Sequence, residues 1–305
     1  MKLTKKEAEK IVKLYDLGEL KKFKLNPGGA VNYNFDFHTS KGIYIIRILG
    51  HKMTKWKKEK LELEFELLDF LKNNEFPYKV PEPLKNNIGK FLFKLNNNYF
   101  WVYEKIPGKV NYKYNNLREV AKALATFHKL TKKFNLNLKQ KYYDLNWLSL
   151  KYFEIRRKIS HLKKMNKVDK LVEDNLNLFE SALNRIIKIN YSKNIILTHS
   201  DFGVHNFLFK GNKITALLDF DNLGSNPRAK EISYPLRRLC FVGGRLSKLK
   251  MKLFLKEYEK IIKIKKEEKD ILLPMMVLDN CNVFWWVYME MKKIHTKNTI
   301  LLKKW

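Results

Sequence analysis

Three side chains that carry oxygen ligands follow one another in residues 199–222, which read HSDFGVHNFLFKGNKITALLDFDN. They are Asp201, Asn206 and Asp219. Phosphoryl transfer requires a group that orients the acceptor hydroxyl, and hard oxygen ligands that hold magnesium against the phosphate oxygens. We predict that Asp201 orients the hydroxyl, and that the carbonyl oxygen of Asn206 and the carboxylate of Asp219 bind the metal. The segment therefore favours magnesium-assisted phosphoryl transfer.

A β-hairpin is predicted to carry these residues. Residues 207–209 indicate a short buried strand, residues 211–212 its turn, and residues 214–218 the partner strand. A rigid sheet can fix side chains at its edges, as a metal site requires. Taken singly, aspartate and asparagine often do no more than cap a turn or end a strand. The order of all three residues around one hairpin favours the site over that alternative.

Two further strands are predicted near the N-terminus, at residues 25–37 and 41–49. The second is an apolar run interrupted by Arg47, and a charged side chain inside such a run must face a partner or solvent. Gly28 and Gly29 form the turn that opens the first segment. Backbone N–H groups of glycines at such a turn can approach phosphates, although any sharp turn uses glycine in the same way.

Residues 199–222 resemble the catalytic and metal-binding loops of the aminoglycoside phosphotransferase and choline kinase superfamily. That superfamily usually shows His-Gly-Asp, an asparagine five positions after the aspartate, and then Ile-Asp-Phe or Ile-Asp-Trp. Here Ser200 stands in place of the glycine and Leu218 in place of the isoleucine. A serine resists the positive φ that glycine adopts in a tight turn. We expect His199 to be a structural residue that hydrogen-bonds the loop, rather than an acid or a base.

The resemblance implies a two-lobed, protein-kinase-like α+β fold with ATP and Mg²⁺ as cofactors. A small lobe, residues 1–105, would hold an antiparallel β-sheet and one helix and would bind the nucleotide. A large, mainly helical lobe, residues 106–305, would carry the catalytic and substrate-binding groups. In such a fold Gly28 and Gly29 would approach the nucleotide phosphates, and Arg47 would grip the α- and β-phosphates.

A helix is predicted over residues 57–73, because leucine and phenylalanine recur along one side of it. Its acids are Glu59, Glu62, Glu64 and Glu66. The resemblance selects Glu64, seven positions before Leu71, as the carboxylate that holds Arg47. The other acids, interspersed with lysine, are typical of a solvated helix face.

Residues 91–95 and 99–104 are predicted to form another strand pair. The resemblance implies that Tyr103, Glu104 and Lys105 form the hinge between the lobes. Their backbone would then bind the adenine of the nucleotide.

The second half of the chain is predicted to be mainly helical, with helices over residues 117–130, 145–165, 167–189, 247–264 and 272–293. His128 lies near the end of the first of these, where a buried or dipole-facing histidine is favoured over a ligand. The last carries Asp279, Asn280, Trp285 and Trp286. These residues could shape an acceptor pocket, with a cationic amine against a tryptophan face, but filling the core is the favoured interpretation.

Composition predicts a cytoplasmic enzyme. With 305 residues, of which 45% are hydrophobic, the chain can bury a sizeable core. No run approaches the roughly 18 apolar residues needed to span a membrane, and the first ten residues have no apolar segment of the signal-peptide type. Two cysteines, Cys240 and Cys281, are too few for a disulfide framework, which favours a reducing compartment.

The formal net charge of +31 invites a nucleic-acid interpretation, because clustered lysines and arginines bind phosphate backbones. The lysines are instead spread along almost every predicted helix. Such spreading is typical of a lysine-biased proteome or of adaptation to heat. We therefore expect no specific nucleic-acid partner and no membrane partner.

Type II homoserine kinases are a further resemblance, which runs with gaps from about residue 5 to residue 224. The runs YDLGELKKFK, NPGGAVNYNFDF and VPEPL carry it. Arg47, the DFDN run at residues 219–222 and the pair Pro227-Arg228 look more like general phosphotransferase and spore-coat kinase-like members. Glu231 stands where the family usually has aspartate. Homoserine is therefore the leading suggestion for the acceptor.

The expected activity is transfer of the ATP γ-phosphate to a hydroxyl of a small metabolite. The alternatives are a choline or ethanolamine kinase, an aminoglycoside kinase, and a binding-only pseudokinase that keeps the fold but lacks turnover. Four arginines follow the metal motif, at Arg228, Arg237, Arg238 and Arg245, with few acids outside lysine-rich helix faces. That balance favours an acceptor that bears a carboxylate over a polycation.

Overall fold

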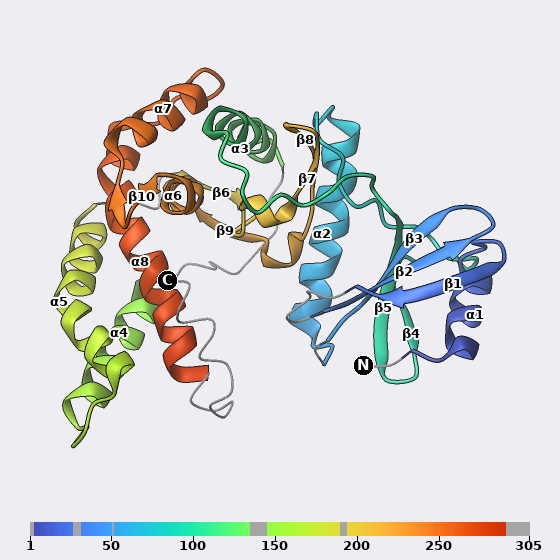
Figure 1. Cartoon of the computed structure of the whole chain (residues 1–305), viewed down its shortest axis with the longest axis horizontal. Coiled ribbons are helices and arrows are strands. Elements are labelled where there is room, and N and C mark those ends of the chain that lie inside the picture. The colour runs from blue at the N-terminus through green and yellow to red at the C-terminus, as the bar shows by residue number, and fades with distance from the viewer. Residues whose placement is uncertain (1–2, 27–31, 51, 135–144, 190–193, 291–305) are drawn as a thin grey trace. The chain divides into compact units, whose positions relative to one another are not determined.

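The structure is a computed structural model that describes residues 3–26, 32–50, 52–134, 145–189 and 194–290 (Figure 1). Gly28 and Gly29, predicted to approach the phosphates, lie outside the described residues. The chain divides into two compact units. The N-terminal unit comprises Met1–Tyr114 and Val204–Asp221, and the C-terminal unit comprises Asn115–Gly203 and Asn222–Trp305. The lobe boundary at residue 105 stays a prediction.

An antiparallel sheet with the strand order β1-β2-β3-β5-β4 forms the core of the N-terminal unit. Its strands are β1 (Leu20–Leu25), β2 (Tyr33–Thr39), β3 (Ile43–Ile48), β4 (Phe93–Leu95) and β5 (Asn98–Glu104). Two helices belong to the same unit, α1 (Lys5–Leu14) and α2 (Lys55–Asn73). Each begins after a threonine, Thr4 or Thr54, whose side chain accepts a hydrogen bond from a backbone N–H of the first turn.

Side chains of β3 alternate between two apolar layers. Ile46 belongs to the layer that contains the buried residues of α1, whereas Ile45 packs with Leu61 of α2. Successive residues of a strand face opposite sides of the sheet, so Arg47 lies on the same side as Ile45. The period of the strand thus directs the guanidinium to the face that α2 covers, and α2 is the helix that carries Glu64.

The strand β1 is not anticipated by the apolar pattern, because half of its sequence LKKFKL is lysine. Lys21, Lys22 and Lys24 are exposed on this edge strand. Charged side chains on an edge strand discourage pairing with other chains. They also leave the strand without the apolar pattern by which strands are predicted.

The predicted hairpin after residue 206 is confirmed. Strands β7 (Phe207–Lys210) and β8 (Lys213–Leu217) pair antiparallel. Gly211 in the turn has a φ of 58°, which glycine adopts at little cost. Short 3₁₀ helices, η2 (Val204–Asn206) and η3 (Phe220–Asn222), lie on either side of the hairpin.

The C-terminal unit is mainly helical. Its elements are α3 (Leu117–Thr131), α4 (Leu145–Ser160), α5 (Lys167–Lys188), β6 (Ile195–Thr198), β9 (Gly224–Pro227), α6 (Arg228–Leu239), β10 (Phe241–Val242), β11 (Arg245–Leu246), α7 (Lys248–Glu259) and α8 (Lys266–Glu290). Helices α5 and α6 both pack on α8, and α3 packs on α7. Helix α8 begins six residues before the predicted start and continues through Pro274. The side chains of Trp285 and Trp286 lie outside the described residues.

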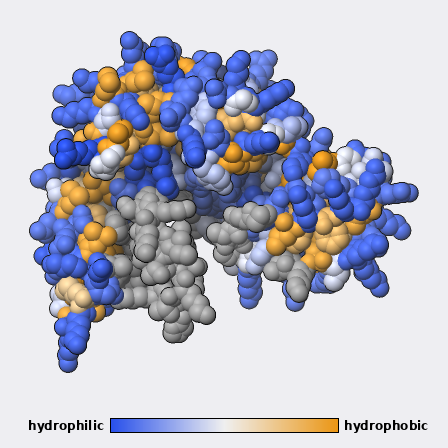
Figure 2. Space-filling view, in the orientation of Figure 1, coloured by the Kyte–Doolittle hydropathy of each residue, from blue (hydrophilic) through white to orange (hydrophobic). Residues whose placement is uncertain are grey.

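The surface that faces the viewer in Figure 2 is largely hydrophilic, with apolar residues in smaller groups. Within the part of the chain that the structure describes, no helix is long and apolar enough to cross a membrane.

Candidate active site

Arg47 is the centre of a charged cluster in the N-terminal unit. Its Nη2 lies 2.8 Å from Oδ1 of Asp219 and 2.6 Å from Oδ2 of Asp221. The arginine side chain is only 8% exposed, whereas those carboxylates are 41% and 27% exposed. Burial acts to lower the pKa of Arg47, but Asp221 and Asp219 raise it above its usual value. The guanidinium therefore stays charged, and its two partners remain accessible from solvent.

The predicted metal ligands, Asn206 and Asp219, lie at the same end of the β7–β8 hairpin. The backbone N–H of Leu218 donates to the carbonyl oxygen of Asn206 at 2.8 Å, which joins the two segments. Asn206 is buried. Asp219 has a φ of 63°, in the left-handed region that aspartate tolerates better than most residues. This turn ends β8 and places the Asp219 carboxylate beside Arg47.

Glu64 is buried on α2, but the predicted Arg47–Glu64 ion pair is not among the ion pairs of the described residues. Arg47 pairs with Asp219 and Asp221 instead. Burial and the nearby charge of Asp221 raise the pKa of Glu64 to about 8, although Arg47 acts to lower it. Glu64 is thus an acid held close to two other carboxylates.

This raised pKa of Glu64 predicts how stability changes with pH. The folded state retains the proton at pH values where the unfolded chain, with a pKa of 4.5, has lost it. The stabilisation is complete below about pH 4.5 and is lost as pH rises through about 8. We expect the free energy of unfolding in metal-free buffer to fall over this range, and Glu64→Gln to flatten the slope. Denaturant unfolding at several pH values measures this, with exposed Glu62→Gln on the same helix as control. An unchanged slope in Glu64→Gln would contradict the assignment.

The three predicted hinge residues lie at the end of β5. Tyr103 and Glu104 belong to the strand and pair with Ile45 and Tyr44 of β3. The backbone N–H of Lys105 donates to the carbonyl oxygen of Ile43 at 2.9 Å, and the Lys105 ammonium forms an ion pair with buried Asp36. Burial raises the pKa of Tyr103 to about 12, so its phenol stays neutral. The chain is therefore held firmly at the point where the hinge is predicted.

Asp221 and Asn32 are site residues that the sequence analysis did not select. The side-chain amide of Asn32 donates to Oδ2 of Asp221, and its Oδ1 accepts from the backbone N–H of Gly50 at 3.1 Å. Asn32 therefore links the segment that follows the predicted phosphate turn to the carboxylate beside Arg47. A second acid two residues after Asp219 was the available signal for Asp221.

Asp201 lies in a loop of the C-terminal unit after β6. Tyr234 of α6 donates its hydroxyl to Oδ1 of Asp201. Burial and the charge of Asp201 raise the pKa of Tyr234, so the phenol stays a neutral donor. The backbone N–H of Asp201 donates to Nδ1 of His199 at 3.3 Å, and that of Gly203 donates to the Asp201 carbonyl at 2.8 Å. His199 thus hydrogen-bonds the loop, as predicted.

Ser200 adopts the left-handed conformation that the family's glycine would occupy, with a φ of 64°. Its hydroxyl lies 2.9 Å from Oγ1 of Thr198 and accepts from the side chain of Asn226 at 3.0 Å. Asn226, on β9, also donates to Thr198 at 2.6 Å. These bonds explain how a serine is tolerated before Asp201.

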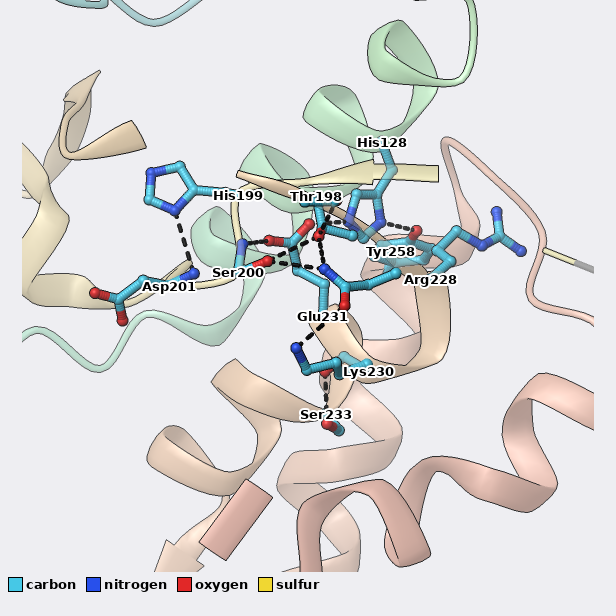
Figure 3. A network of polar contacts seen from close by, with 12 residues as sticks. His128, Thr198, His199, Ser200, Asp201, Arg228, Lys230, Glu231, Ser233 and Tyr258 are labelled. Atoms are coloured by element: carbon cyan, nitrogen blue, oxygen red, sulfur yellow. Dashed lines mark hydrogen bonds and ion pairs between the residues drawn. The ribbon is translucent and has the colours of Figure 1, made fainter. Parts of the chain in front are cut away.

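Glu231 anchors this loop from α6 (Figure 3). Its Oε1 accepts from the backbone N–H of Ser200 at 2.6 Å, and its Oε2 lies 2.7 Å from Nε2 of His128. Nδ1 of His128 lies 2.6 Å from the hydroxyl of Tyr258 on α7. Burial lowers the pKa of His128, so the ring is neutral and donates its single N–H to Glu231. His128 is fully buried, which confirms the structural role predicted for it.

Glu231→Ala is expected to destabilise the chain, because it leaves the Ser200 N–H and the buried His128 ring without their acceptor. Each buried donor that loses its partner costs about 1–3 kcal/mol. We therefore expect a loss of about 2–6 kcal/mol in the free energy of unfolding, measured by denaturant titration. Glu267→Ala on α8, a partly exposed position, is the matched control. A loss below about 1 kcal/mol would show that Glu231 does not anchor the loop.

The chain matches the profile of a phosphotransferase enzyme family over residues 22–246. Its fold is similar to a spectinomycin phosphotransferase solved with ADP and spectinomycin, at 14% identity and a TM-score of 0.67, covering 99% of this chain and 93% of that one. An aminoglycoside phosphotransferase from Alicyclobacillus acidocaldarius has 14% identity and a TM-score of 0.71, with coverages of 99% and 90%. A macrolide 2'-phosphotransferase type I has 12% identity and a TM-score of 0.61, with coverages of 97% and 95%.

No curated protein matches the chain significantly. The solved structures confirm the predicted protein-kinase-like α+β fold, which here combines an antiparallel sheet with a mainly helical second unit.

Proposed function

Because the chain belongs to the phosphotransferase enzyme family, we propose that it is an ATP-dependent kinase of a small hydroxylated metabolite. It is a phosphotransferase with an alcohol group as acceptor. The observation that carries the proposal is the buried guanidinium of Arg47, held against Asp219 and Asp221 at the end of a hairpin. In a kinase, a cation of this kind binds phosphate oxygens, and acids of this kind bind magnesium.

The residues fit a magnesium ion that is shared with the substrate. Asn206 and Asp219 supply hard oxygen donors at one end of the hairpin, and Asp219 is accessible. Among the described residues, no group of three or more histidine, cysteine, aspartate or glutamate side chains gathers to hold a metal. Magnesium in kinases often uses one or two protein carboxylates together with substrate phosphates. When bound, the ion neutralises charge on the phosphate oxygens.

Arg47 fits the phosphates themselves. Its Nε is buried and makes no hydrogen bond among the described residues, so this N–H is available to donate to a phosphate oxygen. We propose that Arg47 grips the α- and β-phosphates, and that Glu64 acts on it as a nearby charged group rather than as its ion-pair partner. Gly28 and Gly29 approach the phosphates in this proposal.

The adenine would be bound by the backbone of Tyr103, Glu104 and Lys105. The nucleotide in the spectinomycin phosphotransferase structure supports a nucleotide site in this fold.

Asp201 is the proposed catalytic residue. Its carboxylate accepts the proton of the acceptor hydroxyl and orients that oxygen toward the γ-phosphorus. Glu231 fixes the loop through Ser200, and Tyr234 fixes the carboxylate. Homoserine is the first acceptor to test, since the sequence favours a carboxylate. The similar structures include a spectinomycin and a macrolide phosphotransferase, so an antibiotic should also be tested as the acceptor.

Magnesium-dependent release of ADP from ATP tests the function. The purified chain is assayed with homoserine, choline, ethanolamine, methylthioribose and kanamycin, with and without EDTA. Acceptor-dependent ADP release that EDTA abolishes supports the kinase. Nucleotide binding without turnover on any acceptor would instead identify the binding-only pseudokinase.

We also propose a cytoplasmic enzyme without a specific nucleic-acid or membrane partner. Cys240 is a free, buried thiol, and burial raises its pKa to about 11, which makes it unreactive. A reducing compartment is compatible with such a residue. Retention on a DNA column at a salt concentration that releases the chain from a cation-exchange column would contradict the expectation of no specific nucleic-acid partner.

A further inference from the structure

A cavity of about 170 Å³ lies in the C-terminal unit. Its walls come from α6, from α8 and from the loop after β6. Lys230, Tyr234 and Arg237 contribute from α6, at positions that share one helix face, and Asp279 contributes from α8. With Glu231 of α6, the cavity therefore combines two cations and two acids within a small volume.

The side chain of Tyr234 connects the cavity to Asp201, the proposed catalytic residue. Tyr234 lines the cavity and donates its hydroxyl to Oδ1 of Asp201. The guanidinium carbon of Arg237 lies 5.2 Å from the centre of the Tyr234 ring. Ser200, which precedes Asp201, is also part of the wall. A ligand in this cavity therefore lies next to the residues that hold the Asp201 carboxylate.

Each of the three charged groups Lys230, Arg237 and Asp279 has at least one neutral hydrogen-bond partner in the unit. Asp279 accepts from the hydroxyl of Ser233 at 3.1 Å. Nη1 of Arg237 donates to Oδ1 of Asn280 at 2.9 Å, and Lys230 donates to Asn226 at 3.3 Å.

Burial raises the pKa of Asp279 and lowers the pKa values of Lys230 and Arg237. Desolvation thus outweighs the attraction among these groups, and a ligand that brings opposite charges to them would offset that cost.

We infer that this cavity binds the acceptor and that the acceptor is a small zwitterion, an amino acid with a side-chain hydroxyl. Its carboxylate faces Arg237 and Lys230, and its ammonium group faces Asp279. This inference rests on the proposed kinase activity. Glu231 also borders the cavity, but its two oxygens already accept from Ser200 and His128, so Asp279 is the acid that meets the amine.

Size and charge both separate this ligand class from the alternatives. Pockets for drug-sized ligands occupy about 300–1,000 Å³, so this cavity suits a smaller molecule. A polycationic aminoglycoside would place like charge against Lys230 and Arg237, which disfavours it. Choline lacks the carboxylate that those two cations would bind.

A set of matched acceptors tests the inference. L-Homoserine, L-serine and L-threonine are zwitterions with a hydroxyl. 4-Hydroxybutyrate is homoserine without the ammonium group, and 3-amino-1-propanol is homoserine without the carboxylate. We expect kcat/KM for the best zwitterion to exceed that of both singly charged analogues, choline and kanamycin by at least about tenfold, the loss typical for one missing charge-assisted hydrogen bond.

Two variants assign the charges. Asp279→Asn should raise KM for the zwitterion and for 3-amino-1-propanol by about tenfold to hundredfold, but change KM for 4-hydroxybutyrate by less than about threefold. Arg237→Gln should show the opposite selectivity, and Lys230→Gln provides a second cation variant if Arg237→Gln does not fold. Asp270→Asn on α8 and Arg157→Gln on α4 remove the same charges at exposed positions and serve as controls.

Failure of this inference is distinguishable from failure of the kinase proposal. Turnover of choline or kanamycin above every zwitterion, or equal effects of both variants on both singly charged analogues, would overturn the acceptor assignment while leaving the kinase intact. ATP hydrolysis that depends on magnesium, but that no zwitterion stimulates, overturns it as well. Absence of magnesium-dependent ATP turnover under all conditions would instead remove the proposed function.

Discussion

Asp201→Asn is expected to lower kcat by about 10²–10⁴-fold, the usual contribution of a positioned general base. Asparagine keeps an oxygen that can accept from Tyr234, so the loop should retain its conformation. Asp201 is hydrogen-bonded within its loop and to Tyr234 of α6, whereas Asp219 forms an ion pair with Arg47 in the N-terminal unit. We therefore expect the dissociation constant of Mg·ATP to change by less than about threefold, since hydrogen bonds and ion pairs to the phosphates are unaffected.

The complementary variant, Asp219→Asn, should behave in the opposite way. It removes the negative charge of the proposed metal ligand, which is also one of the two charges that hold Arg47, so magnesium-dependent nucleotide binding should weaken sharply. Calorimetric titration of ATP with magnesium, and again with EDTA, measures this separately from turnover. Asp270→Asn at an exposed position of α8 controls for the loss of charge. An equal loss of nucleotide affinity in Asp201→Asn and Asp219→Asn would show that the division of roles is wrong.

Local patterns predicted the elements that carry the site. The hairpin can be predicted because two short apolar runs flank a Gly-Asn turn, and both predicted strands agree with the structure to within about one residue. The position of Arg47 inside an apolar strand predicted that it must find a partner. Strand β1 could not be predicted in this way, because its solvated lysines leave no alternation of apolar residues in the sequence.

The partners of Arg47 were beyond the reach of those patterns. The family resemblance selected Glu64, but the ion pairs of Arg47 depend on the left-handed turn at Asp219 and on the 3₁₀ turn that holds Asp221. Neither turn has a periodic signature. Tyr234 was missed for a related reason, since its bond to Asp201 joins residues of two different elements and depends on how α6 packs.

Arg47→Ala is expected to weaken ATP binding by about tenfold to hundredfold and adenosine binding by less than about threefold. Only ATP has phosphates for the guanidinium to bind. The substitution also leaves Asp219, Asp221 and Glu64 without their cation, so the carboxylates would repel the incoming phosphates. Because Asp219 and Asp221 are partly exposed, solvent screens their mutual repulsion, and the loss of stability should stay below the 3–5 kcal/mol of a fully buried broken pair.

Arg47→Lys separates the charge of this residue from its geometry. Lysine keeps the positive charge, but a single ammonium group cannot reproduce the planar fork that offers several N–H donors at once. If Arg47 binds phosphate through that fork, Arg47→Lys should recover only part of the ATP affinity that Arg47→Ala loses. The pKa of Glu64 provides a second measurement, since a retained cation should keep it lower than in Arg47→Ala. Equal weakening of ATP and adenosine in Arg47→Ala would mean that Arg47 supports the sheet and α2 rather than the phosphates.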